Sequence, residues 1–343
     1  MSTVATSTVG VIANPHAGKD IRRLVAHASP TSDSAKIGII RRAVLGAVEG
    51  GATRLLLAPD KHSLAERAVD DLELGDGVVV EVLDEPYWGR SADTTGMAVR
   101  MAKEEAGAVL VLGGDGTNRD VAKGWLDAPM MPISTGTNNV FPRLIEATLA
   151  GLAAGLVATG VVSLADGTDQ ADVIHVTVDD GDDDLALVDL ALLAARFTGS
   201  RAVWHPDQLR AVLACIAEPA SVGLSAIAAL IAPLERTEPG AVLVRCSAPG
   251  AVADTGVPTP HRTVRAAVAP GMFADVRWSW AERVPAGGTV DLVGPGVLSF
   301  DGERDRTLAD GQVAHATVRR DGPHVINPQR TIAAAARARR FDR

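Results

Sequence analysis

Aromatic side chains are scarce in this sequence. Phe, Trp and Tyr together make up 3% of the 343 residues, although hydrophobic residues make up 47%. The core must therefore be built from Ala, Val, Leu and Ile, and alanine-rich helices with Val- and Leu-rich strands suit an α/β architecture. The length is sufficient for two domains and a sizeable core.

Cysteine is also rare, with Cys215 and Cys246 as the two examples. Their spacing fits neither a metal site nor a disulfide framework, so both are expected to behave as small buried apolar residues. Residues 1–9 contain no basic region followed by an apolar segment, so no signal peptide is predicted. We predict a reducing, cytoplasmic location.

Positive charge is in deficit, because the formal net charge is -9 and the pI is near 5.4. This balance argues against a general nucleic-acid binder and against stable association with an anionic membrane. An anionic substrate would have to be held by local dipoles and a few cations.

One uncharged stretch, residues 147–165, has to be compared with the requirements of a membrane-spanning helix. A spanning helix requires about 20 predominantly apolar residues. Ala and Gly dominate this stretch instead, and Gly151 and Gly155 have a GxxxG spacing. We predict a small-residue packing helix up to Gly160, followed by a short strand over Val161–Leu164.

The first part of the chain alternates predicted strands with predicted helices. The strands are expected at 9–13, 54–58, 78–83, 108–112 and 131–133, and the helices at 36–49, 63–71, 91–105 and 117–125. This alternation predicts parallel β-α-β units, whose ligands lie at the carboxyl ends of the strands. Polar loops rich in Gly or Asn follow three of these strands, at 14–20, 113–118 and 134–139.

After about residue 160, turns separate the predicted strands, which are expected at 172–178, 185–193, 241–246, 263–268 and 289–293. This pattern favours a mainly antiparallel β domain. A helical insertion is predicted at 207–231, and the sequence does not define its role. The acidic run 179–184 is interpreted as a solvated hairpin tip, with a calcium site as the less favoured alternative.

The predicted fold class is therefore an N-terminal α/β domain with a parallel three-layer sheet, plus a second, mainly antiparallel β domain with a helical insertion. We place the first domain at residues 1–155 and the second at 156–325. The tail, 326–343, contains a basic, alanine-rich helix from Thr331 and is predicted to pack back on the first domain.

The most informative segment is Gly113–Thr117, which reads Gly-Gly-Asp-Gly-Thr directly after the apolar run 108–112. Glycine tolerates tight turns and has no Cβ to hold a ligand away, so the backbone here could approach a polyanion. The helix predicted after it would direct its first N–H groups at phosphates. For such a segment taken alone, an ordinary strand–turn–helix junction is the alternative.

Other phosphate-binding motifs are not present. A Walker A loop at residues 13–20 would need Gly at the first position and Ser or Thr at the last, where the chain has Ala13 and Asp20. No GxGxxG follows the first strand, and protein-kinase signatures are missing. The sequence therefore supports neither a P-loop NTPase, nor a Rossmann dinucleotide fold, nor a protein kinase.

Two segments resemble motifs of the superfamily that contains diacylglycerol kinases, sphingosine kinases and NAD kinases. Asn14–Lys19, NPHAGK, resembles the NPxxGK loop at the first strand. Gly113–Gly124, GGDGTNRDVAKG, resembles the GGDGTxxEVxNG segment. Asp120 stands in the acidic position of that segment, and Lys123 replaces its Asn.

Two further segments follow in the expected order. Ser134–Asn139, STGTNN, is similar to the third nucleotide loop, and Phe300–Glu303, FDGE, resembles the xDGE element of the lipid-kinase branch. The length and the segments 14–26 and 200–204 look most like the acetoin-catabolism X protein group, which is related to ATP–NAD kinases.

The resemblance implies a nucleotide-binding first domain, a second domain for substrate and metal, and ATP lying across the three loops. The implied nucleotide-binding residues are Asn14, Lys19, Gly113, Gly114, Gly116, Thr117, Thr135, Gly136, Thr137 and Asn138. The acceptor is expected to contact Asn118, Asp120 and Asn139. Asp115 is expected to be the general base or the carboxylate that organises Mg2+, and these two roles are not separated by the sequence. The implied metal ligands are Asp115, Asp301 and Glu303.

The predicted function is an ATP- and Mg2+-dependent kinase that phosphorylates a hydroxyl of a small soluble acceptor. NAD is the leading candidate acceptor, and an acetoin-related metabolite or a polyol comes next. The sequence does not distinguish ATP from polyphosphate as the phosphoryl donor. The resemblance also implies a homodimer, because superfamily members often pair through the second domain.

Two other functions stay open. A lipid kinase of diacylglycerol type is favoured by Asp301–Glu303, but the acidic composition and the lack of a basic amphipathic membrane helix oppose it. A nucleotide- or NAD-binding regulatory protein without turnover is favoured by Asp120 and Lys123, which depart from the lipid-kinase pattern.

Overall fold

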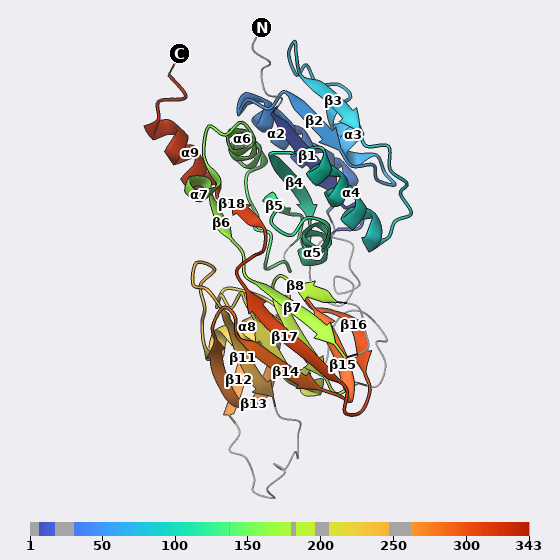
Figure 1. Cartoon of the computed structure of the whole chain (residues 1–343), viewed down its shortest axis with the longest axis vertical. Coiled ribbons are helices and arrows are strands. Elements are labelled where there is room, and N and C mark those ends of the chain that lie inside the picture. The colour runs from blue at the N-terminus through green and yellow to red at the C-terminus, as the bar shows by residue number, and fades with distance from the viewer. Residues whose placement is uncertain are drawn as a thin grey trace, which may run out of the picture.

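The computed structural model describes residues 7–17, 31–136, 138–179, 183–195, 206–246 and 262–342. They form an α/β domain and a β domain that lie end to end (Figure 1). The predicted fold class is confirmed: one sheet is mostly parallel and covered by helices, and the second domain is mainly antiparallel.

The first sheet has the strand order β3-β2-β1-β4-β5-β18-β6. Its strands are β1 (Thr8–Ala13), β2 (Arg54–Leu57), β3 (Val79–Val82), β4 (Ala108–Gly113), β5 (Pro129–Ser134), β6 (Thr168–Gln170) and β18 (His324–Ile326). Strands β1 to β5 and β18 pair in parallel, and β6 pairs with β18 in the antiparallel sense. Because β1, β4 and β5 are neighbours, their carboxyl ends meet at one edge of this sheet.

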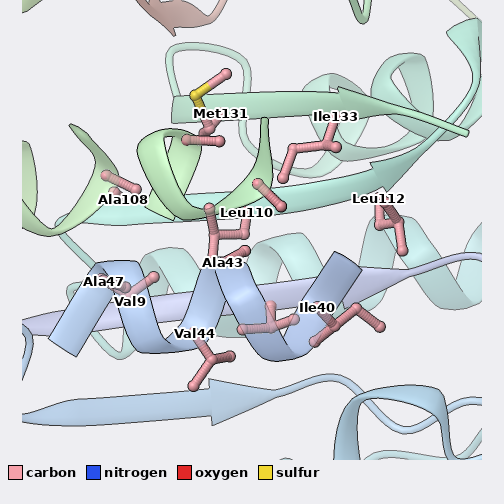
Figure 2. Close-up of a cluster of buried hydrophobic side chains, with 14 of the residues drawn as sticks. Val9, Ile40, Ala43, Val44, Ala47, Ala108, Leu110, Leu112, Met131 and Ile133 are labelled. Atoms are coloured by element: carbon pink, nitrogen blue, oxygen red, sulfur yellow. The ribbon is translucent and has the colours of Figure 1, made fainter. Parts of the chain in front are cut away.

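Helices cover both faces of the first sheet. The helices of this domain are α2 (Asp33–Glu49), α3 (Leu64–Val69), α4 (Ser91–Lys103), α5 (Asp115–Gly124), α6 (Ala147–Ala158), α7 (Leu164–Gly167) and α9 (Pro328–Arg337). Val9 of β1 lies in the core beneath α2 and α6, whereas Ile12 lies in the core beneath α4 and α5. Figure 2 shows the first of these cores, where Ile40 and Ala43 of α2 face Leu110 of β4. Burial on both faces explains why β1, β2, β4 and β5 are near-continuous apolar runs, whereas the edge strand β3 is exposed.

Helices α2 and α6 touch backbone to backbone. A Cβ added to Gly151 of α6 would lie 1.8 Å from the carbonyl oxygen of Ala43, and one on Gly46 of α2 would lie 2.1 Å from that of Thr148. The GxxxG stretch is therefore a small-residue packing helix, as predicted. Among the described residues, no helix combines the length and the apolar character needed to cross a membrane.

The second domain contains a sheet with the order β12-β13-β11-β10-β9-β15-β16 and a second sheet with the order β14-β17-β7-β8. The strands are β7 (Val173–Val178), β8 (Asp184–Ala186), β9 (Asp189–Leu193), β10 (Leu209–Ala214), β11 (Ala241–Cys246), β12 (Arg262–Ala269), β13 (Met272–Val284), β14 (Thr289–Val293), β15 (Gly296–Phe300), β16 (Glu303–Leu308) and β17 (Val313–Arg319). One apolar core joins the two sheets, with Val176 and Leu213 as members, and helix α8 (Leu224–Ile231) covers the other face of the larger sheet.

The chain leaves the first domain through β6 and returns to it through β18 (Figure 1). The boundary predicted at residue 155 falls inside α6, and β6 still belongs to the first sheet. The C-terminal helix α9 packs against α6, where Ala335 is fully buried beside Leu156. The first domain thus includes residues from both sides of the β domain in sequence.

Three local predictions are wrong. The predicted strand Val161–Leu164 is instead an irregular connection that ends where α7 begins at Leu164, because α6 ends at Ala158 and Gly160 takes a positive φ of 69°. The helical insertion is helical over Leu224–Ile231, and a short 3-10 turn covers Pro206–Gln208, but Leu209–Ala214 is strand β10, held between β9 and β11. The predicted strand 185–193 is interrupted at Leu187 and Val188, whose N–H groups bind the Asp301 carboxylate instead of a neighbouring strand.

Candidate active site

The first two predicted loops touch each other. The Asn14 side-chain amide, just after β1, donates to Thr117 Oγ1 at 2.9 Å. Asn14 Oδ1 accepts the N–H of His16 at 2.8 Å, which makes an Asx turn before the loop continues. Asn14 therefore shapes its own loop and also joins it to helix α5.

A buried lysine supports the first loop. Lys36 of α2 is 0% exposed, and its Nζ donates to the carbonyl oxygen of Pro15 at 2.6 Å. Sequence analysis did not identify this residue, since a lysine in a helix is normally a solvated cation. Lys19, which was predicted to bind phosphate, lies outside the described residues, as do Thr137 and the segment 200–204.

The second and third loops are also in contact. A Cβ on Gly114 would lie 2.9 Å from Asn139 Oδ1, and the Asn139 amide donates to Ser134 Oγ at 2.8 Å. The N–H of Gly136 donates to the same Ser134 hydroxyl at 3.2 Å. A Cβ on Gly113 would lie 2.5 Å from that of Thr117. A side chain at Gly113 would therefore overlap the Thr117 Cβ, whereas one at Gly114 would displace the Asn139 side chain.

Three buried polar atoms in this region have no hydrogen-bond partner among the described residues. They are Asn118 Oδ1, Thr135 Oγ1 and Asn138 Oδ1. Asn118 is 0% exposed, and its amide nitrogen donates to the Gly114 carbonyl at 2.8 Å. The two amide oxygens can accept from N–H or O–H groups, and the hydroxyl can donate as well as accept. Buried polar atoms are normally partnered, so these positions suit a ligand that carries both donors and acceptors.

The Asp115 carboxylate is bound by backbone N–H groups. Its oxygens accept from Val140 at 3.0 and 3.1 Å and from Phe141 at 2.8 Å. Asp115 thus lies at the first turn of α5, as the motif predicts, and it also joins the glycine loop to the residues after the third loop.

The two acidic residues of the FDGE element, Asp301 and Glu303, have different surroundings. Asp301 and Gly302 have φ values of 51° and 76° and form the two-residue turn between β15 and β16. The Asp301 carboxylate accepts the N–H groups of Leu187 at 3.0 Å, Val188 at 2.8 Å and Asp189 at 3.2 Å. Burial raises the pKa of Asp301 to about 6. This carboxylate holds its own domain together.

Glu303, in contrast, reaches the glycine loop from the second domain. A Cβ on Gly116 would lie 3.5 Å from Glu303 Oε1. Asp120, on α5, interacts electrostatically with Glu303 and accepts a hydrogen bond from the Ser91 hydroxyl. Burial, with a smaller contribution from Glu303, raises the pKa of Asp120 to about 6. Two predicted site carboxylates from different domains therefore lie beside the glycine loop.

Arg119 connects α5 to the second domain and was not identified from the sequence. Its guanidinium donates to the Asp184 carboxylate at 2.6 Å and to the Leu185 carbonyl at 2.7 Å, and lies over the Phe300 ring at 4.6 Å. Lys123, the residue that departs from the motif, also pairs with Asp184, at 3.0 Å. The Asp184 side chain is therefore largely enclosed at the domain boundary, which the prediction of a solvated hairpin tip for 179–184 did not include. Asp179 and Asp183 are exposed at the β7–β8 hairpin, as predicted, and residues 180–182 lie outside the described part.

Two family models match the chain. One is described as the ATP-NAD kinase N-terminal domain and matches residues 45–161, and the other, the acetoin catabolism protein X C-terminal domain, matches residues 172–321. A curated relative, acetoin catabolism protein X of Cupriavidus necator, is 34% identical over 320 residues, which cover 90% of this chain and 86% of the relative.

Among solved structures, yeast NADH kinase complexed with NADH has a TM-score of 0.54 at 12% identity, covering 98% of this chain and 88% of that chain. That likeness shows the fold. A putative diacylglycerol kinase from Bacillus anthracis str. Sterne has a TM-score of 0.44 at 13% identity, and the match covers 94% of this chain and 99% of that chain. With an NAD kinase-like fold and this degree of identity to a curated relative, the chain belongs to the acetoin catabolism protein X family.

Proposed function

We propose that this protein is an ATP- and Mg2+-dependent kinase that transfers a phosphoryl group to a hydroxyl of a small acceptor, with NAD as the leading candidate. The main support is the contact between three strand-end loops, around which Asn118, Thr135 and Asn138 carry buried polar atoms unpartnered among the described residues. A nucleotide offers both the donors and the acceptors that these atoms require. The family match to an ATP-NAD kinase domain supports a pyridine nucleotide as acceptor ahead of an acetoin-related metabolite or a polyol.

The phosphates would lie at the glycine loop and the start of α5. Uncompensated N–H groups and the helix dipole make a helix N-terminus favourable for an anion. The Thr117 hydroxyl, which accepts a hydrogen bond from Asn14, could donate to a phosphate oxygen. Lys19 remains a prediction as the phosphate-binding cation.

The carboxylates near the glycine loop fit a Mg2+ site in part. No group of three or more His, Cys, Asp or Glu side chains that could hold a metal ion is found in the described part of the chain. In phosphoryl-transfer sites, however, Mg2+ is held by one or two carboxylates together with phosphate oxygens and water. Glu303 suits this role, whereas Asp301 does not, because backbone N–H groups occupy its carboxylate. Bound Mg2+ would neutralise negative charge on the transferred group.

Asp120 is the carboxylate that we assign to the acceptor hydroxyl. It lies on α5 close to Glu303, beside the loop that would hold the phosphates. A carboxylate in this position would orient the hydroxyl and take its proton during transfer. The Asp115 carboxylate, the earlier candidate, is bound by the N–H groups of Val140 and Phe141.

The proposal is tested by incubating the purified protein with ATP, Mg2+ and one acceptor at a time, and measuring ADP and phosphorylated product. The panel contains NAD, acetoin, small polyols and diacylglycerol in vesicles. We expect ADP formation that depends on NAD, and a loss of about 100-fold or more in kcat for Asp120→Asn. The exposed Asp127, shortly after α5, provides the control variant Asp127→Asn. Acceptor-independent ADP release alone, or none at all, contradicts the proposal.

One observation favours a second candidate function, a nucleotide-binding protein without turnover. Two of the three carboxylates expected to bind metal, Asp115 and Asp301, are engaged by backbone N–H groups. Calorimetry that detects ATP binding, together with no transfer to any acceptor of the panel, would select this function. A cytoplasmic homodimer remains part of either proposal, and sedimentation velocity tests the dimer.

A further inference from the structure

The peptide segment Val140–Phe141, just after the third loop, is held on its N–H side by the first domain. Both N–H groups donate to the Asp115 carboxylate, with distances of 2.8 to 3.1 Å. Val140 and Phe141 are buried, at 6% and 1% exposure. A charged acceptor for two buried N–H groups forms a strong interaction, since hydrogen bonds to an ionised group exceed neutral ones in strength.

The same two residues are held on their C=O side by the second domain. Arg236 follows α8, and its Nη1 donates to the Phe141 carbonyl at 2.8 Å while its Nη2 donates to the Val140 carbonyl. The planar guanidinium presents two nitrogens in a fixed geometry to two adjacent carbonyl oxygens, whereas the lysine ammonium is a single point charge on a flexible chain. Electrostatic attraction between Arg236 and Asp115 acts across the segment.

A glutamate fixes the arginine. Glu218 accepts from Arg236 Nε at 3.1 Å and from Arg143 Nη2 at 2.5 Å. Arg143 lies just beyond the clamped segment, and its carbonyl accepts the N–H of Ser134, the last residue of β5. The third loop, Ser134–Asn139, is therefore anchored at both ends, and one anchor comes from the second domain.

We propose that Asp115 and Arg236 are positioning residues that clamp the Val140–Phe141 backbone from opposite sides and so hold the third loop in its nucleotide-binding shape. The clamp makes the shape of that loop depend on the position of the second domain. Asp115 then acts through the loop, and the chemical step does not require it to accept a proton. The binding readout below rests on the proposed function, whereas the clamp itself does not.

The clamp is tested by amide hydrogen exchange on the full-length protein without ligand. In Asp115→Asn and in Arg236→Lys we expect peptides that contain Val140 and Phe141 to exchange at least tenfold faster than in the unchanged protein. Arg265→Met is the matched control, because Arg265 forms an exposed ion pair with Asp275 in the same domain as Arg236. Exchange in this segment that is the same in both clamp variants and in the control overturns the inference.

Kinetics and calorimetry with ATP separate positioning from proton transfer. Arg236→Lys and Asp115→Asn should each raise the KM or Kd for ATP at least tenfold, while kcat at saturating ATP stays within threefold. A large loss of kcat in Asp115→Asn, with an unchanged KM, would assign it to proton transfer and overturn the positioning role. If exchange accelerates as expected but the unchanged protein neither binds nor consumes ATP, the proposed function fails and the clamp stands.

Discussion

Two regions of the first domain use glycine in opposite ways. On the face of the sheet covered by α2 and α6, a Cβ on Gly151 would lie 1.8 Å from the carbonyl oxygen of Ala43, which is fixed backbone. At the carboxyl edge of the sheet, a Cβ on Gly114 would lie 2.9 Å from the side-chain oxygen of Asn139. The first contact permits no adjustment, because two helices would have to separate, whereas the second can be relieved by the rotation of one side chain.

The α2–α6 face also differs from the boundary between the two domains in the interactions that stabilise it. Apolar contacts among residues such as Ile40, Val44 and Leu110 stabilise the α2–α6 face, so this stability should not depend on pH. The boundary between the domains relies on ion pairs, including the largely buried pair of Arg119 with Asp184 and the half-buried pair of Arg236 with Glu218. Stability contributed at this boundary should depend on pH, because burial makes the pKa of Asp172 differ between the folded and the unfolded chain.

The largest expected effect is that of Gly151→Ala. The new Cβ would overlap the Ala43 carbonyl, so we expect the free energy of unfolding to fall by about 3 kcal/mol or more. Gly38→Ala in α2 is the control, since its Cβ would lie 3.7 Å from the nearest atom, an Arg42 side-chain nitrogen. That variant should be more stable by about 0.5–1 kcal/mol, because Ala favours a helix over Gly. Urea unfolding measures both, and equal midpoints would show that the helices do not touch as described.

A smaller effect is expected for pH at the domain boundary. Asp172, between β6 and β7, is 6% exposed, and burial raises its pKa to about 6 despite Arg320 at 3.5 Å. The unfolded pKa is near 3.9, so the folded form holds its proton more tightly. The resulting contribution to stability is complete below about pH 4 and is lost as pH rises through about 6, a change of about 2–3 kcal/mol.

Asp172→Asn should remove this part of the pH dependence, because the amide has the shape of the protonated acid and does not titrate. Thermal or urea unfolding between pH 4 and 7 measures the slope for both proteins. Asp127→Asn, at an exposed site, should keep the original slope. A slope that survives in Asp172→Asn would assign the pH dependence to other carboxylates.

The smallest effect on stability is expected for Gly114→Ala. Its φ of -99° is open to any residue, and Asn139 can turn aside, so the loss should be about 1 kcal/mol or less. The turned Asn139 side chain would release Ser134 and disturb the third loop, so we expect ATP affinity to fall at least tenfold. Gly96→Ala in α4, where no atom lies within 4 Å of the new Cβ, should leave affinity unchanged. If Gly114→Ala binds ATP normally, the strand-end glycine has no role in the ligand site.

The sequence predicted the loops of the candidate site but few of the residues that hold them. Glycines after an apolar run and the order of the motifs were sufficient to place Asn14, Gly113–Thr117 and Ser134–Asn139 at strand ends. Lys36 and Arg236 had no comparable signal, because each acts on backbone carbonyls distant in sequence. Arg119 lies within the resembling segment, at a position that the motif leaves undefined.

Short-range residue patterns determined three features: the alternation of parallel strands with helices, the packing role of the GxxxG helix and the polar loops at strand ends. They could do so because strand and helix periodicity and glycine geometry act over a few residues. The tertiary structure alone decided which carboxylates face the glycine loop, that Asp301 supports its own domain while Glu303 crosses to the other, and that Asp184 is buried. These outcomes depend on how two domains are placed against each other. No local pattern contains that information, because the partners of each charge are brought together only by long-range packing.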